Sequence, residues 1–272
     1  MTYVYDGTWD GLMCLVYRTA KDKAAPDAIL RPSDAELGFL FDTATIEINS
    51  EIAQATAHAL KKRASGRMLS DAWFALLSCD IHGGRNVDMP LWRVLANVWE
   101  RGKKAEFDFA DESVLAVRKA AQRTGSEYNK YLGIVRFRNL GGIFYAELEP
   151  DCDVLALLAD HFSARLSDQG WILHDLRRKK AALYDMKTWI IADMPQPAPG
   201  SIEKDDIYQE LWREFYRGTT TTQRLNYKTQ RGHMPKKYWK HLTETPGEFS
   251  GKGLGTQSAM SQPKNKHSLK IV

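Results

Sequence analysis

Five side chains that can bind an anion or transfer a proton lie close together in the sequence. They are His161, Arg165, His174, Asp175 and Arg177. Histidine titrates near neutral pH, so His161 and His174 could act as acid and base while Asp175 orients one of them. Arginine binds phosphate and carboxylate groups through paired hydrogen bonds. The cluster therefore indicates either a cationic pocket or a polar brace, in which Asp175 caps the next turn and the histidines are hydrogen-bonded core residues.

A second candidate is the basic and aromatic sequence KKYWK at residues 236–240. Lys236, Lys237 and Lys240 could neutralise phosphates. Tyr238 and Trp239, if exposed, could stack on unpaired bases. The alternative is that the two aromatic rings pack under the domain while the lysines are solvated.

The charge of the chain is distributed unevenly. Residues 211–272 carry a net charge of +9, from twelve lysines and arginines against three glutamates, whereas the rest of the chain carries −5. Such asymmetry is typical of a protein with a polyanionic partner, although a solvated surface has the same pattern. Arg136, in the sequence GIVRF, either extends this basic surface or pairs with Glu147 on a neighbouring strand.

Metal and cofactor chemistry has little support in the sequence. Cys14, Cys79 and Cys152 are far apart and none is in C-x-x-C spacing, so a zinc or iron–sulfur site is not indicated. His161, His174 and Asp175 could form a facial triad of metal ligands, but their spacing is not diagnostic. Phosphate-binding loops and the common hydrolase motifs are absent. We therefore predict no metal and no cofactor.

The apolar pattern around the first cluster predicts short strands and one helix. The helix is expected at residues 154–166, after a cap at Asp153. Strands are expected at residues 134–137, 143–149, 171–175, 181–185 and 188–192, with a hairpin turn at 139–142. Short strands joined by short turns favour a mostly antiparallel sheet with one covering helix.

Periodicity then predicts which side chains share a face. His161 and Arg165 are four residues apart and lie on one side of the expected helix. In the expected strand, Ile172 and His174 point to one side of the sheet. If the helix covers that side, His161 and His174 approach each other.

The rest of the chain completes an α+β fold. A helical region is expected at residues 50–124, before the sheet, and helices are expected again after it. We predict a single α+β domain over residues 1–245, followed by a disordered tail at 246–272. Its parts are the helical region at 50–124, the mixed sheet region at 133–192 and a basic helical arm at 202–245.

The apolar content also bears on location. The sequence has no run of eighteen apolar residues, so no membrane partner is expected. The first residues, MTYVYDGTWDG, lack the basic and apolar regions of a secretory signal. We therefore expect a cytoplasmic protein.

Six segments together resemble a known bacterial family. They are YVYDGTWDGLMC (3–14), GIVRF (133–137), YAELEPD (145–151), LLADHFSARL (157–166), WILHDLRRKKAALY (171–184) and MPKKYWKHLTE (234–244). The family that they resemble is a domain of unknown function linked to DNA metabolism and DNA repair. It occurs beside a radical-SAM DNA-repair protein, and some members are fused to a uracil-DNA-glycosylase-type domain. Relatives tend to have a histidine near the position of Glu127, which this sequence lacks.

The resemblance implies DNA as a ligand and a separate radical-SAM protein as a partner, but it assigns no reaction. The leading hypothesis is a DNA-repair-associated protein that binds nucleic acid and acts with that partner. One alternative is a hydrolase or lyase acting on nucleotides or DNA, with His161, His174 and Asp175 as its acid–base site. Another is a structural adaptor without a catalytic site.

Overall fold

The computed structural model of the protein describes residues 1–32, 42–78, 87–108, 110–197, 211–212, 214–215 and 234–242. The predicted tail at 246–272 and most of the predicted arm at 202–245 lie outside these residues. Within the described ranges the chain forms α-helices and two β-sheets, which confirms the predicted α+β class.

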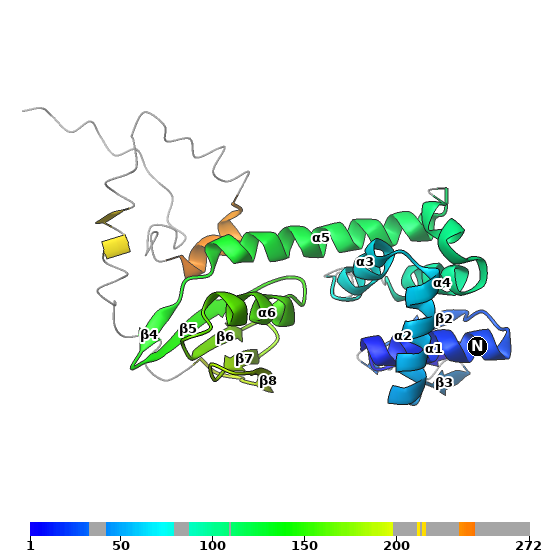
Figure 1. Cartoon of the computed structure of the whole chain (residues 1–272), viewed down its shortest axis with the longest axis horizontal. Helices are drawn as coiled ribbons and strands as arrows, with labels where there is room; N and C mark the ends of the chain where they lie inside the picture. Colours follow the sequence, from blue (N-terminus) through cyan, green and yellow to red (C-terminus); the bar gives the residue numbers. More distant parts are fainter. Residues whose placement is uncertain are drawn as a thin grey trace, which may run out of the picture.

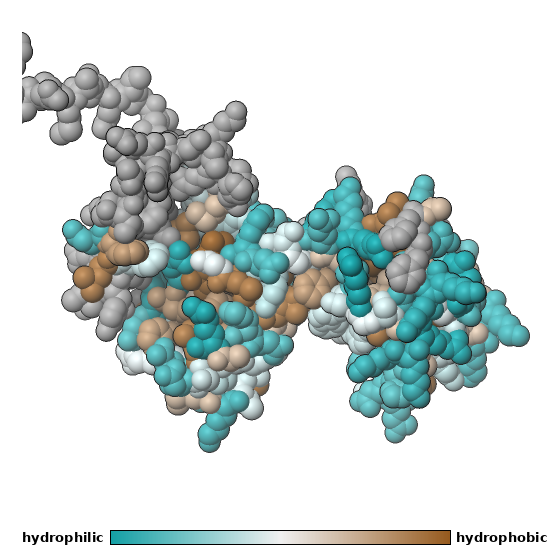
Figure 2. All heavy atoms as spheres, turned by 45° about the horizontal axis from the view of Figure 1, so that its top comes forward, coloured by the Kyte–Doolittle hydropathy of each residue, from teal (hydrophilic) through white to brown (hydrophobic). Residues whose placement is uncertain are grey.

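The N-terminal lobe consists of a small parallel sheet and the helices packed against it (Figure 1). Its strand order is β2-β1-β3, with β1 (Thr2–Val4), β2 (Ala28–Leu30) and β3 (Thr43–Thr45). The helices are α1 (Trp9–Asp22), α2 (Ser50–Arg63), α3 (Gly66–Leu76), α4 (Asp88–Arg101) and the 3-10 helix η3 (Gly102–Phe107). In the space-filling view, hydrophilic residues cover most of the visible face of this lobe (Figure 2).

The C-terminal lobe contains the mostly antiparallel sheet that the sequence predicts. Its strand order is β4-β5-β6-β7-β8, and only β5 and β6 are parallel. The strands are β4 (Arg138–Leu140), β5 (Ile143–Leu148), β6 (Trp171–Asp175), β7 (Lys180–Tyr184) and β8 (Trp189–Asp193). The helix α6 (Leu155–Arg165) connects the parallel pair, because parallel neighbours require a crossover. A short 3-10 helix, η5 (Lys236–His241), packs against this lobe.

One long helix, α5 (Glu112–Ile134), belongs to both lobes and runs along the top of them in Figure 1. Its first half contributes Val114 and Val117 to the N-terminal core, and its last turn contributes Tyr131 to the C-terminal core. The lobes also meet where the amide of Asp153 donates to the carbonyl of Leu77 at 2.9 Å. Because α5 is shared, we continue to expect residues 1–245 to fold as one unit.

The length of α5 corrects the sequence prediction, which placed a strand at residues 134–137. The helix continues through Gly125 to Ile134, and residues 135–137 are not in a strand. Thr124, Glu127 and Tyr131 are buried, so buried positions recur every three to four residues as far as the last turn of the helix. The hairpin is therefore β4 to β5, with Gly141 and Gly142 in its turn at positive φ.

A second correction concerns the start of α6. Asp153 is not its cap: the capping position is Val154, and no side chain accepts a hydrogen bond there. The amide of Asp153 is instead used in the contact with Leu77 between the lobes.

Candidate functional site

The structure does not bring the two predicted histidines together. α6 covers the side of the sheet to which Trp171 and Leu173 point, and these residues share a core with Phe162 of α6. Because strand neighbours alternate, His174 lies on the opposite side of the sheet from His161. The expected approach of His161 to His174, and with it a shared acid–base site, is therefore wrong.

His174 is a hydrogen-bonded core residue. It is only 1% exposed. Its Nδ1 lies 2.8 Å from the hydroxyl of Tyr145, and its Nε2 lies 2.8 Å from the carbonyl oxygen of Met194. Each ring nitrogen thus has a protein partner, and the ring holds β5, β6 and the end of β8 together.

Asp175 likewise acts as a brace. Its carboxylate accepts hydrogen bonds from the amides of Arg177 and Arg178 at 3.0 and 3.1 Å, and from the Arg178 guanidinium at 3.0 Å. Burial nevertheless raises the pKa of Asp175, although these donors oppose the rise. This is the capping role that the sequence offered as the alternative to a catalytic one.

We expect His174→Ala to lower the free energy of unfolding by about 2 kcal/mol, because it leaves a cavity and removes two buried hydrogen bonds. Chemical denaturation measures this loss. His161→Ala is the control: His161 is half-buried on α6, and its loss should cost roughly 0.5 kcal/mol or less. An unchanged stability for His174→Ala would contradict the bracing role.

The remaining cations of the first cluster are dispersed. Arg165 is exposed at the end of α6, whereas Arg177 pairs with Asp151. Arg136 donates to the carbonyl of Gly133 at 2.9 Å, and its guanidinium lies 5.4 Å from the centre of the Trp212 ring. Of the two alternatives for Arg136, the pairing with Glu147 is not formed.

Arg138 makes that pair instead, at 3.1 Å. The reason is the shift of the strand to residues 138–140, which sets Arg138 opposite Tyr145.

The aromatic residues of η5 face the core. Tyr238 is 5% exposed and Trp239 is 4% exposed. The Tyr238 ring meets the edge of Tyr131 at a centroid distance of 5.3 Å. Neither ring is placed to stack on a base, so the two rings pack under the domain, as the alternative expected of them.

The lysines of η5 differ in their surroundings. Lys236 is exposed. Lys237 pairs with Asp151 and, at 3.1 Å, with Glu127, while Lys240 pairs with Glu149. These carboxylates belong to α5 and to the chain that follows β5, so the pairs fasten η5 to the lobe.

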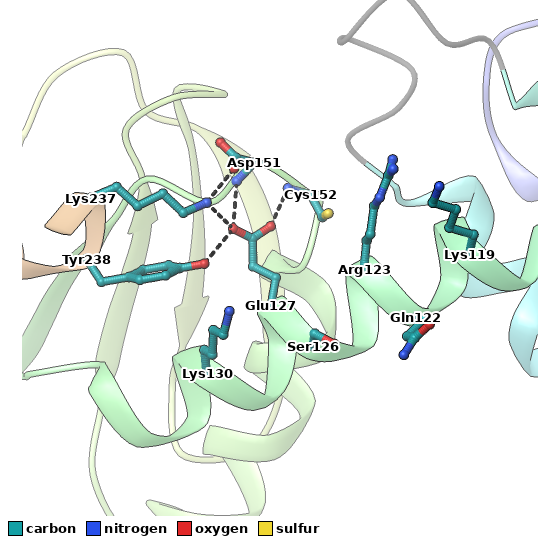
Figure 3. Close-up of a pocket in the computed structure, with 10 residues that line it drawn as sticks. All are labelled: Lys119, Gln122, Arg123, Ser126, Glu127, Lys130, Asp151, Cys152, Lys237 and Tyr238. Carbon is teal, nitrogen blue, oxygen red and sulfur yellow. Dashed lines mark hydrogen bonds and ion pairs between the residues drawn. The ribbon is translucent and has the colours of Figure 1, made fainter. Parts of the chain in front are cut away.

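Glu127 is the centre of this arrangement (Figure 3). Its buried carboxylate accepts hydrogen bonds from the amides of Asp151 and Cys152 at 3.1 and 2.6 Å and from the Tyr238 hydroxyl at 3.2 Å. Burial alone would raise the pKa of Glu127, but the two amides and the charge of Lys237 together hold it below its ordinary value. The carboxylate therefore stays ionised and joins α5, the turn after β5, and η5.

Sequence reasoning missed Glu127 as a structural centre. A signal was present, because Glu127 lies three residues after the buried Thr124 and four before the buried Tyr131. A carboxylate in that stripe requires partners inside the fold. The partners come from residues 24 and 110 or more positions away, which no local pattern reveals.

A cavity of about 400 Å³ opens beside Glu127. On α5 it is lined by Lys119, Arg123 and Lys130, which we call the basic stripe, and Lys237 lies across from them (Figure 3). The three positions are i, i+4 and i+11, so they fall on one face of the helix. Lys119 and Lys130 are exposed and Arg123 is half-buried. The surface suits an elongated anion.

The two carboxylates of this pocket do not cancel the stripe. Glu127 and Asp151 both accept from Lys237, and Asp151 also pairs with Arg177. Partial burial alone would lower the pKa of Lys237, but Asp151 and Glu127 raise it, so Lys237 stays charged. Glu127 and Asp151 thus pair with Lys237 and Arg177, and not with the basic stripe.

The described part of the chain also bears on metal sites and on membrane-spanning helices. There, no group of three or more histidine, cysteine, aspartate or glutamate side chains is arranged to hold a metal ion. No helix within the described ranges combines the length and the apolar character that crossing a bilayer requires.

Comparison with known proteins identifies a family match. A family model described as a domain of unknown function, DUF4130, matches residues 85–244, more than half of the chain. A search of curated proteins found no match. The matched region contains α5, the C-terminal lobe and η5, and with them the whole of the pocket beside Glu127.

Proposed function

The chain belongs to the DUF4130 family, a domain of unknown function, and we propose that it binds nucleic acid along the basic stripe of α5. The observation that carries this proposal is the line formed by Lys119, Arg123 and Lys130 beside a cavity. From the helical rise, Lys119 and Lys130 are about 16 Å apart along the axis. An anion that meets all three must be extended, as a phosphate backbone is.

The charge of the chain supports the same ligand. The net charge of residues 211–272 is +9, and η5, which lies within this segment, packs at the edge of the pocket. Positive charge near a binding surface attracts a polyanion and speeds its association. The aromatic rings of η5 do not contact the nucleic acid, because Tyr238 and Trp239 are buried.

The family resemblance of the sequence motifs supplies the context of the proposal. It favours DNA as the nucleic acid, repair as the process and a separate radical-SAM enzyme as the partner. The three cysteines of this chain are too widely spaced in the sequence for the cluster of such an enzyme, so the partner would supply that chemistry. We propose the class of this partner enzyme and not its identity.

A salt titration tests the binding. A fluorescently labelled DNA is titrated with the protein at several salt concentrations, and log affinity is plotted against log salt. Three or four phosphate contacts predict a slope of about −2 to −3.5. Binding without salt dependence, or no binding at low salt, would overturn the proposal.

A further inference from the structure

A second hollow lies on the neighbouring side of α5, between α5 and α3. We call it the α3–α5 groove, and its volume is about 530 Å³. The residues that matter here are Arg67, Asp71 and Phe74 of α3, and Arg118, Gln122 and Gly125 of α5. Gln122 lines both this groove and the pocket beside Glu127, so the two hollows adjoin around one helix.

The groove combines the groups that recognise a nucleobase. Phe74 is half-buried, and its ring meets Tyr128 edge to face at a centroid distance of 6.5 Å. Aromatic rings and guanidinium planes stack on unpaired bases, while carboxylates and amides bind their polar edges. The groove provides one of each kind: the ring of Phe74, the guanidinium of Arg67, the carboxylate of Asp71 and the amide of Gln122.

Asp71 lines the groove and is half-buried. Burial raises the pKa of Asp71, although the charges of Arg67 and Arg118 oppose the rise. A carboxylate accepts hydrogen bonds, so Asp71 can accept from the amino group of a base. The volume of the groove falls within the range of about 300–1,000 Å³ that is typical of small-ligand pockets.

Gly125 leaves the floor of the groove open. A Cβ atom built on Gly125 would lie 3.7 Å from the nearest ring atoms of Phe74, an ordinary van der Waals contact. A larger side chain at this position would therefore project over the Phe74 ring and into the groove. Helical geometry does not require glycine here, because a helix disfavours it.

We propose that the α3–α5 groove binds one unstacked base of a single-stranded nucleic acid whose phosphates lie along the basic stripe. The inference rests on the proposed function and adds a ligand class to it. Arg118 lines the groove and Lys119, its neighbour in sequence, lines the pocket. A strand can thus place a phosphate on one side of α5 and its base on the next. A base held in a duplex is not free to enter.

The test uses the full chain and three labelled ligands of about 12 nucleotides. They are a single strand, the same strand with abasic sites throughout, and the duplex. Gly125→Leu fills the groove, and its helix propensity favours folding by roughly 0.5–1 kcal/mol. Gly133→Leu is the matched control, because it makes the same change in the same helix with no heavy atom within 4 Å of the added Cβ.

The wild-type protein should bind the single strand roughly tenfold more tightly than the abasic strand, and more tightly than the duplex. Gly125→Leu should bind the single strand only as tightly as the abasic strand, with an unchanged salt slope. Gly133→Leu should retain the tenfold preference. Phe74→Leu, which removes the ring and keeps an apolar side chain, should act in the same direction as Gly125→Leu.

The outcomes separate the two proposals. Equal affinity for all three ligands, or an undiminished preference in Gly125→Leu, overturns the base-binding groove and leaves the basic stripe intact. If none of the three ligands shows salt-dependent binding, the proposed function is overturned, and the groove proposal with it.

Discussion

Replacing Lys119, Arg123 and Lys130 together by glutamate is expected to weaken DNA binding roughly 100-fold at physiological salt. Each basic residue that contacts a phosphate contributes about one to the salt slope, so the slope should fall by about 2 to 3. The three side chains lie on one face of α5, and two of them are exposed, so they meet a ligand together. Affinity and slope are measured in the same salt titration.

The control for this variant carries the same change of charge elsewhere. Lys61, Lys62 and Lys103 are exposed residues of the N-terminal lobe that do not line the pocket. Their replacement by glutamate lowers the net charge equally, so it reports the general effect of charge on association. Circular dichroism verifies that both variants are folded. If the two triple variants lose affinity equally, the stripe is not the binding surface.

Glu127→Ala is expected to lower the free energy of unfolding by about 3 kcal/mol. The change removes the carboxylate to which the amides of Asp151 and Cys152 donate and takes a partner from Lys237 and Tyr238. Because Glu127 joins three segments, hydrogen exchange should also accelerate at the two amides. Chemical denaturation and hydrogen exchange by mass spectrometry measure these effects.

Glu100→Ala is the matched control for that prediction. Glu100 is an exposed glutamate near the end of α4, and its loss should cost roughly 0.5 kcal/mol or less. A similar small cost for Glu127→Ala would show that the buried carboxylate does not hold η5 and the turn in place.

The stabilising effect of Glu127 should also depend on pH. The pKa of Glu127 in the folded protein is below its ordinary value of 4.5, so the contribution is fully present above that value. It is lost as the pH falls through the folded pKa. The difference in stability between the wild type and Glu127→Gln should therefore be largest near neutral pH and decrease in acid. An increase of that difference in acid would contradict the ionised carboxylate.

The elements of the C-terminal lobe were largely predictable because their signals are local. Short apolar runs, WIL at 171–173 and AALY at 181–184, mark β6 and β7, and helical spacing marks α6. The boundary between α5 and the first strand of the sheet was not predictable in the same way. Ile134, Val135 and Phe137 are β-branched or aromatic, which favours a strand, but packing on the C-terminal core ends the helix there and moves the strand to Arg138.

The candidate site was predictable only in its chemistry. The basic residues of η5 were recognised in the sequence, whereas their carboxylate partners Glu127, Glu149 and Asp151 were not. The face of the sheet that α6 covers decided the role of His174. That choice depends on Trp171 and Leu173, which bury more apolar surface against α6 than Ile172 and His174 would.

The sequence by itself determined the α+β class, the order of the elements in the lobe and the excess of positive charge after residue 211, since periodicity and composition are properties of the chain alone. Only the tertiary structure decided which charges meet. α5 brings Glu127 to the turn at Asp151 and to Lys237, and it sets Lys119, Arg123 and Lys130 beside the resulting cavity. The physical reason is that ion pairs and cavities depend on distances between segments far apart in the chain, and packing fixes those distances.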